Sequence, residues 1–115
     1  MDYQPVFRQL YQDFNARRAE AVLTHMHPSV QWPKAFEGGY VSGHDEVRAY
    51  WTRQWTEINP NVTPIDISQQ QDGTIDVKVH QLVSDWQGKV LFDGLVRHVY
   101  TLQGDLIQRM DIELV

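Results

Sequence analysis

The chain lacks cysteine, lacks an excess of basic residues and lacks any long apolar run. Without cysteine, disulfide bonds, thiolate chemistry and cysteine-ligated zinc are excluded. The 10 lysines and arginines are outnumbered by 15 aspartates and glutamates, giving a net charge of −5. This balance argues against nucleic acid, whose phosphates need a basic surface. No stretch could cross a bilayer, and the N-terminal residues lack the basic start and apolar core of a signal peptide. We therefore predict a cytoplasmic protein that binds neither nucleic acid nor membrane.

Short motifs for cofactors and nucleophiles are also missing. The sequence has no glycine-rich phosphate loop, no nucleophile elbow and no Ser-His-Asp ordering. His25 and His27 have a His-x-His spacing, but on a helix these side chains point apart, with no acidic ligand fixed nearby. We therefore predict no metal and no cofactor.

The length and composition indicate one domain. The 115 residues are 42% hydrophobic, which suits one domain over residues 1–115 with a single core.

The first half of the chain is predicted to be helical. From Tyr3 to Phe14, apolar residues recur at three- and four-residue steps and predict a helix. Residues 19–26 predict a second helix that Pro28 ends, followed by a short extended segment at residues 30–32.

A third helix is predicted after three glycine-marked turns. Ser42 and Asp45 form a plausible capping pair, and the acidic residues Asp45 and Glu46 suit the first turn because of the helix dipole. Its predicted buried side consists of Val47, Tyr50, Trp51, Trp55 and Ile58.

The second half predicts an antiparallel meander of four strands, at about residues 62–71, 74–86, 89–102 and 105–114. Asp72-Gly73, Gln87-Gly88 and Gln103-Gly104 separate runs rich in β-branched and aromatic residues, as in hairpins with two-residue loops.

Counting outward from these turns predicts which side chains share a face. The count pairs Ile67 with Lys78, and Ile65 with His80. It also pairs His80 with Leu95, Leu82 with Asp93, Ser84 with Leu91, Lys78 with Arg97, and Arg97 with Met110. His80 and Arg97 then share a face with a large apolar set: Ile65, Ile67, Leu82, Leu91, Leu95, Val99, Leu106, Met110, Ile112 and Leu114. The opposite face is also substantially apolar.

Three segments carry a resemblance to a known family. They are FNARRAEAVLTHMHPSVQW from Phe14, GGYVSGHDEVRAYW from Gly38 and RHVYTLQGDLIQRMDI from Arg97. With their spacing, they resemble the NTF2-like superfamily, which includes ketosteroid isomerase and the SnoaL-like polyketide cyclases. The resemblance implies an α+β cone: three N-terminal helices packed on a curved, mostly antiparallel sheet, with a pocket between them. It also implies that dimers through the outer sheet face are common.

The catalytic groups of ketosteroid isomerase are not retained. That enzyme uses a carboxylate base and an oxyanion hole of a tyrosine and a neutral aspartic acid. When the two sequences are aligned, Arg97 stands where that enzyme has its aspartic acid. Its tyrosine aligns near Leu10, with Tyr11 one position away, and its base aligns near Lys34. We therefore expect no isomerase activity by the carboxylate mechanism.

Two residues are candidates for catalysis. Arg97 would bind a carboxylate or a developing oxyanion, since its planar fork suits such groups; alternatively, it forms an internal salt bridge with Asp93, Asp76 or Glu46. His80 would move a proton, or else be a hydrogen-bonded core histidine. The predicted ligand-binding residues are Trp32, Trp51, Trp55, Leu82, Leu95, Val99 and Met110.

Two functions remain open from the sequence. The first is an isomerase, cyclase or hydratase acting on an apolar, oxygenated small molecule. The second is a non-catalytic module that binds a small acidic ligand or only dimerises, with Arg97 in a structural salt bridge. For either function we expect a homodimer through the outer sheet face, because that face is too apolar for solvent. Its predicted residues are Val79, Val96, His98, Tyr100 and Arg109.

Overall fold

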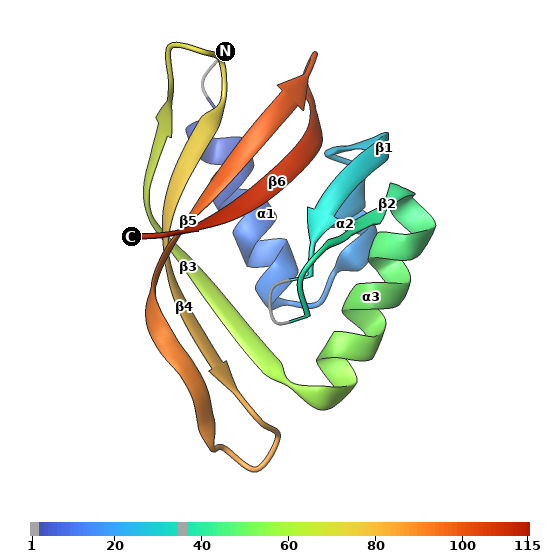
Figure 1. Ribbon diagram of the computed structural model, residues 1–115, viewed down its shortest axis with the longest axis vertical. Coiled ribbons are helices and arrows are strands. Elements are labelled where there is room, and N and C mark those ends of the chain that lie inside the picture. Colours follow the sequence, from blue (N-terminus) through green and yellow to red (C-terminus); the bar gives the residue numbers. More distant parts are fainter. Residues whose placement is uncertain (1–2, 35–36) are drawn as a thin grey trace.

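The computed structural model describes residues 3–34 and 37–115. Helices and strands follow one another in a mixed order (Figure 1). The helices are α1 (Gln4–Asn15), α2 (Ala19–Leu23) and α3 (Gly43–Glu57). The strands are β1 (Met26–Pro33), β2 (Tyr40–Ser42), β3 (Asn59–Gln69), β4 (Ile75–Ser84), β5 (Val90–Gln103) and β6 (Leu106–Leu114). None of the helices in these ranges is both long and apolar enough to span a membrane.

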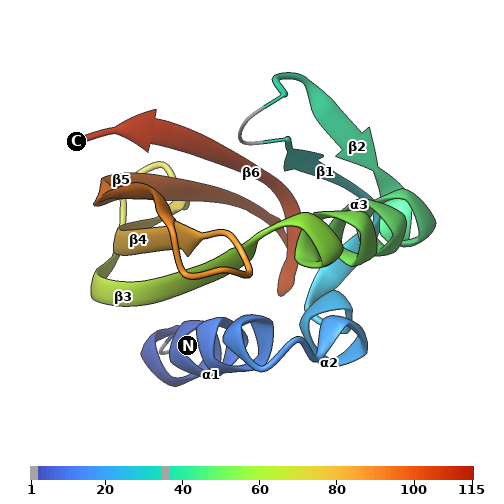
Figure 2. The same ribbon diagram turned by 90° about the horizontal axis from the view of Figure 1, so that it is seen from below.

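The strands form one curved sheet with the order β2-β1-β6-β5-β4-β3. All neighbours are antiparallel except β1 and β6, which run parallel. Seen from below, the helices lie on the concave side of the sheet, and the described chain places no helix on its outer side (Figure 2). The predicted α+β cone, with three helices against a curved and mostly antiparallel sheet, is confirmed.

The helices form much as their apolar spacing predicts. Phe7, Leu10 and Tyr11 are the buried apolar residues of α1, and Val47, Tyr50 and Trp51 are those of α3. The start of α3 differs in detail, because the backbone N–H of Ser42 donates to Glu46 Oε1 at 2.8 Å and the Ser42 side chain makes no cap. Ser42 is still the residue that precedes the helix, as predicted.

The second helix is shorter than predicted. It ends at Leu23, and Met26 begins β1 instead of closing a helix. The cause is tertiary, since Ile107 N donates to His25 O at 2.8 Å and Met26 pairs with Ile107 in the neighbouring β6. Pairing with a distant strand outweighs a weak local helix preference.

The four-strand meander is present, but each of its three turns differs from the prediction. At Gln87-Gly88 the loop is one residue longer, since Asp85 N donates to Lys89 O at 2.9 Å, and a bulge then restores the predicted register. The Gln87-Gly88 hairpin pairs His80 with Leu95 and Lys78 with Arg97, as predicted, although a bulge pairs Ser84 with Val90. Around Asp72-Gly73 the loop is longer, with Gln69 opposite Ile75. This shift pairs Ile67 with Val77 and Thr63 with His80, so the predicted pairing of β3 is wrong.

The last hairpin also shifts. Gln103 pairs with Leu106, so the two-residue loop is Gly104-Asp105, and a bulge follows between Thr101 and Leu102. As a result, Arg97 pairs with Glu113, and Met110 pairs with Tyr100. The predicted pairing of Arg97 with Met110 is wrong. Arg109, Asp111 and Glu113 therefore share a face with Arg97, whereas the count from the turns placed them with His98.

Ile67 and Met110 face the helices as predicted, but in β4 and β5 the face that packs against the helices is the opposite of the predicted one. It is built mainly from β-branched and aromatic residues: Ile75, Val77, Val79, Val83, Val96, His98, Tyr100 and Met110. The outer face carries Ile65, Leu82 and Leu95, whose exposed fractions are 50%, 37% and 42%. Arg109, Asp111 and Glu113 lie on this outer face, as predicted, and the described residues of the inner sheet face carry no charge.

Candidate functional site

The candidate site is a pocket between α1, α3 and the concave face of the sheet. Its walls come from α1 (Leu10, Tyr11, Phe14), β1 (Trp32) and β5 (His98, Tyr100), among others. The enclosed part has a cavity volume of about 50 Å³, and the atom-free space reaches about 560 Å³ when the open mouth is included. The enclosed volume is small beside the usual range for small-molecule sites, so a ligand would also occupy the open mouth.

Three polar side chains meet on the inner wall of this pocket. The hydroxyl of Tyr11 lies 2.7 Å from Nδ1 of His98 and 2.9 Å from the hydroxyl of Tyr100. All three residues are buried, with exposed fractions of 5% or less. One helix and one strand thus bring together residues separated by 87 and 89 positions. We call Tyr11, His98 and Tyr100 the Tyr–His–Tyr network.

Burial keeps the Tyr–His–Tyr network uncharged. Desolvation lowers the pKa of His98 from 6.5 to about 4, so the imidazole is neutral at physiological pH. Desolvation likewise raises the pKa of both tyrosines, with a further contribution for Tyr11 from its neighbour Tyr100. The network therefore consists of neutral hydrogen-bonding groups, and each hydroxyl keeps its proton.

One nitrogen of His98 remains available to a ligand. Nε2 makes no hydrogen bond within the described part of the chain, and it is not among that part's fully enclosed polar atoms. A neutral imidazole has one donor and one acceptor nitrogen, so the partner of Nδ1 decides the role of Nε2. When Tyr11 donates to Nδ1, Nε2 carries the ring proton and can donate it.

The rest of the pocket is apolar or weakly polar. Gln54, Tyr50 and Gln81 add amide and hydroxyl groups, and Gln54 Nε2 donates to the Tyr50 hydroxyl at 3.1 Å. Among the described residues that line this pocket, none carries a charge at neutral pH. The described chain also holds no group of three or more metal-ligating side chains. This wall suits a neutral ligand with few oxygen atoms.

The predicted ligand-binding residues separate into three groups. Trp32 and Met110 line the pocket. Trp51 is fully buried behind it, with its ring 5.3 Å from Trp32 edge to face and 5.8 Å from Trp55. Trp55 lines a groove on the other side of α3. Leu82, Leu95 and Val99 lie on the outer sheet face, away from the pocket.

The predicted catalytic residues also lie outside the pocket. His80 Nε2 is 2.6 Å from Asp93 Oδ1, and its side chain is 43% exposed on the outer face. Arg97 forms ion pairs with Asp76 and, at 3.4 Å, with Glu113. The alternative interpretation of Arg97, a structural salt bridge, therefore describes its geometry. Neither residue reaches a ligand bound between the helices and the sheet.

The sequence-based list missed the Tyr–His–Tyr network. His98 and Tyr100 were placed on the outer face with Val79 and Val96, and that placement is wrong because all four are buried beneath the helices. Tyr11 was noted only as a neighbour of Leu10; in the structure both residues line the pocket. Lys34 is not among the described residues of this wall.

The fold and the pocket together define an NTF2-like protein, a cone with a pocket beneath its helices. A family model described as SnoaL-like domain matches residues 7–110, and the chain belongs to this family. No curated protein sequence matches the chain significantly.

Solved structures with the same fold have low sequence identity. An NTF2-like protein of unknown function from Burkholderia pseudomallei is 23% identical, with a TM-score of 0.84, over 100% of this chain and 92% of that one. TerC, co-crystallized with polyporic acid, is 22% identical with a TM-score of 0.81, over 97% and 89%. SalBIII, an epoxide hydrolase/cyclase-like enzyme of pyran ring formation in salinomycin, is 16% identical with a TM-score of 0.79, over 96% and 88%. These likenesses establish the fold.

Proposed function

We propose that the protein binds a neutral, largely apolar small molecule through a carbonyl oxygen, and that it acts on this molecule as an isomerase, cyclase or hydratase. The single observation that carries the proposal is the uncharged Tyr–His–Tyr network on the wall of an apolar pocket. In that setting a hydrogen bond is stronger than in water, because no solvent competes for the groups.

The network can polarise a carbonyl group without any change of charge. In the proton arrangement that we propose, Tyr100 donates to Tyr11, Tyr11 donates to Nδ1 of His98, and Nε2–H of His98 donates to the ligand oxygen. A neutral imidazole is a better match for an enolate oxygen than an imidazolium would be in a buried site, because no charge has to be desolvated first. Polarising a carbonyl is one requirement of double-bond isomerisation, aldol-type ring closure and conjugate addition of water. The α-proton that enolisation releases would pass to solvent water at the open mouth, since the described wall offers no carboxylate.

Two of the structural relatives are described by oxygenated small molecules, although one of these is an acid and not a neutral compound. One is described by its complex with polyporic acid and the other by its role in forming a pyran ring. Arg97 has no part in the proposal, since it is ion-paired on the outer face.

A second candidate is binding without catalysis. It is favoured by the absence of any carboxylate among the described pocket residues, because enolisation also needs a proton acceptor. The two candidates share the ligand class and differ in whether the bound ketone exchanges its α-protons.

The test compares a ketone with its hydrocarbon. Titration with 2-tetralone and with tetralin, followed by the fluorescence of the tryptophans, should show that Tyr11→Phe and His98→Gln weaken ketone binding about tenfold. Hydrocarbon binding should hardly change. Tyr3→Phe is the matched control, since this tyrosine lies outside the pocket. Equal losses for ketone and hydrocarbon would contradict the proposed hydrogen bond.

Catalysis is measured separately by proton NMR in deuterated water. Wild-type protein should accelerate deuterium exchange at the α-carbons of bound 2-tetralone, and His98→Gln should abolish the acceleration. Binding with no accelerated exchange would leave the non-catalytic candidate as the function.

A further inference from the structure

Arg17 has an unusual position at the end of α1. It is the only residue other than glycine with a positive φ in the described chain, at 64°. Its backbone N–H donates to Phe14 O at 3.0 Å and that of Arg18 donates to Asp13 O at 2.8 Å. These two bonds form a Schellman motif, whose left-handed position is usually glycine because a Cβ is strained there.

The guanidinium of Arg17 is partly enclosed and has no counter-ion among the described residues. Its Nη2 donates to Asn59 Oδ1 at 2.6 Å and its Nη1 to Phe14 O at 3.4 Å, both uncharged acceptors. The carbon between the nitrogens lies 5.4 Å from the centre of the Trp55 ring. Within residues 3–34 and 37–115, no carboxylate lies within ion-pair distance of this side chain.

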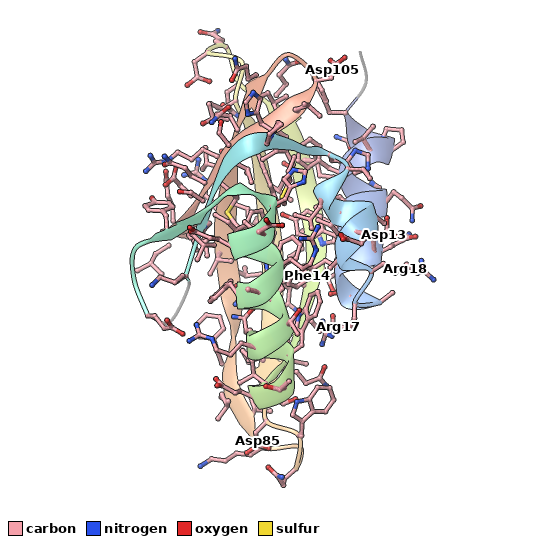
Figure 3. The ribbon with its side chains drawn as sticks, turned by 90° about the vertical axis from the view of Figure 1, so that its right-hand side faces the viewer. Asp13, Phe14, Arg17, Arg18, Asp85 and Asp105 are labelled. Atoms are coloured by element: carbon pink, nitrogen blue, oxygen red, sulfur yellow. The ribbon has the colours of Figure 1, made fainter. Side chains whose placement is uncertain are left out.

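The neighbouring arginines differ in this respect. Arg18 pairs with Asp13 at 3.2 Å, and Arg48 pairs with both Glu20 and Asp45 at 2.8 Å. All three arginines line one groove between α2 and α3, together with Trp55. Figure 3 shows Phe14, Arg17 and Arg18 on the side of the molecule where α3 faces the end of α1. Two of the three cations in the groove are therefore neutralised, and Arg17 alone is left to attract an anion.

We propose that Arg17 is the anchor of an anion site in the groove between α2 and α3, where it binds the carboxylate or phosphate group of a ligand. A half-buried cation without a counter-ion is costly, and an oxyanion would offset that cost. The fixed, planar fork over Trp55 suits a bidentate oxyanion. Burial also lowers the pKa of Arg17, in keeping with a guanidinium that no carboxylate of the described chain supports. This site is separate from the Tyr–His–Tyr network and does not depend on the function proposed for it.

The experiment uses adjacent arginines as test and control. The variants are Arg17→Asn, chosen because asparagine tolerates positive φ, and Arg18→Asn, which removes the same charge from the next residue. Inorganic phosphate, acetate and 2-naphthoate are titrated at constant ionic strength, and ¹H–¹⁵N NMR follows the Arg17 Nε–H and the Trp55 indole N–H. Tighter binding of 2-naphthoate than of acetate would assign the anion to a larger organic ligand, and tighter phosphate binding would assign it to a phosphate group.

We expect saturable shifts with millimolar Kd in wild type and in Arg18→Asn. In Arg17→Asn, the anion-induced shift of the Trp55 indole N–H should disappear, or the Kd of the anion should rise about tenfold. Three outcomes would each overturn the proposal. They are shifts of equal size and Kd in Arg17→Asn and wild type, an equal loss of anion binding in Arg17→Asn and Arg18→Asn, and no saturable shift in wild type.

A stability measurement excludes the remaining explanation, that Arg17 only tethers α1 to β3. Arg17→Gly should abolish anion binding with little change in Tm, since glycine relieves the strain of the left-handed position. A large fall in Tm together with unchanged anion binding would show that the residue is a tether.

Discussion

His98 shows how a single buried side chain can make stability depend on pH. Its pKa is about 4 in the folded protein, and that of the unfolded chain is near the ordinary value of 6.5. Between these values the unfolded chain binds more protons, so stability falls as the pH drops through this window. The contribution is fully present above about pH 6.5 and is lost by about pH 4. At about 1.4 kcal/mol for each pKa unit, the difference is about 3 kcal/mol.

We therefore predict that His98→Gln flattens the pH dependence of unfolding between pH 4 and 6.5. Urea denaturation at half-unit steps of pH measures this slope directly. The control is His80→Gln, which removes a histidine with a 43% exposed side chain from the outer face. If the control flattens the curve as much as His98→Gln does, the buried ring is not its source.

For single residues, the sequence predicts which kinds of side chain line the pocket better than it predicts which face of the sheet each side chain points to. Trp32 and Met110 were identified as pocket residues and do line it. His98 and Arg97 are neighbours in one strand, so an error of one position exchanges a neutral hydrogen-bonding group for a cation. Only the pairing with β6, which places Ile112 opposite His98 and Glu113 opposite Arg97, resolves the choice.

Among the elements, the end of α1 is fastened to the edge strand β3 by one side chain. Asn15 Nδ2 donates to Val62 O at 2.8 Å, and Asn15 Oδ1 accepts from Val62 N at 2.9 Å. The side-chain amide of Asn15 thus takes the place of a neighbouring strand, because it bonds both the N–H and the C=O of the buried residue Val62. Without it, Val62 would lose both partners where water has little access.

We predict that Asn15→Ala destabilises the protein by about 1–3 kcal/mol, the cost of leaving such groups unpaired. Asn15→Asp should also destabilise it, because a carboxylate cannot donate to Val62 O. Gln12→Ala, at an exposed position of the same helix, is the control. Chemical denaturation gives all three values, and an Asn15→Ala variant as stable as the control would show that water replaces the amide.

Elements with a clear period were predicted well, and short ones were not. The apolar stripe of α1 and the alternating strands of the meander carry enough local signal. Residues 30–32 were predicted to be extended and lie in β1. The end of α2 and the rest of β1 depend on pairing with β6, about 80 residues later, and no local pattern contains that information. The turns mark where strands end, but their bulges, which set the register, follow from packing.

For the whole molecule, the open question is what covers the outer face of the sheet. Ile65, Leu82 and Leu95 are exposed there, and no helix of the described chain lies over them (Figure 2). The same face carries both signs of charge, including Arg97 beside Asp76. A second copy related by a two-fold axis could bury the apolar residues and place opposite charges together. We propose a homodimer through this face, in which Ile65, Leu82 and Leu95 take the place of the buried residues Val79, Val96, His98 and Tyr100. Arg109, also expected there from the sequence, does lie on this face.

We predict that Leu95→Glu converts the dimer into monomers at tens of micromolar protein, because it places a charge at the centre of the interface. Sedimentation velocity measures the change. Leu114→Glu is the control, as this residue is 86% exposed at the end of β6. A wild-type protein that sediments as a monomer would refute the dimer. The architecture itself was predictable, since the order of helices and strands matches the family resemblance, whereas nothing in the spacing of residues indicates which face meets a partner.

The apolar character of both faces of β5 bears on how this pocket could change over generations. Where one face of a strand is polar, a one-residue insertion turns polar side chains into the core. In β5, such an insertion would replace the buried residues Val96, His98 and Tyr100 by Leu95, Arg97 and Val99. The buried surface would then stay mostly apolar. A single insertion before β5, matched in the next turn, could thus replace a neutral pocket with a cationic one. For a chain of this kind, insertions and deletions offer a shorter route to a new ligand than a series of substitutions.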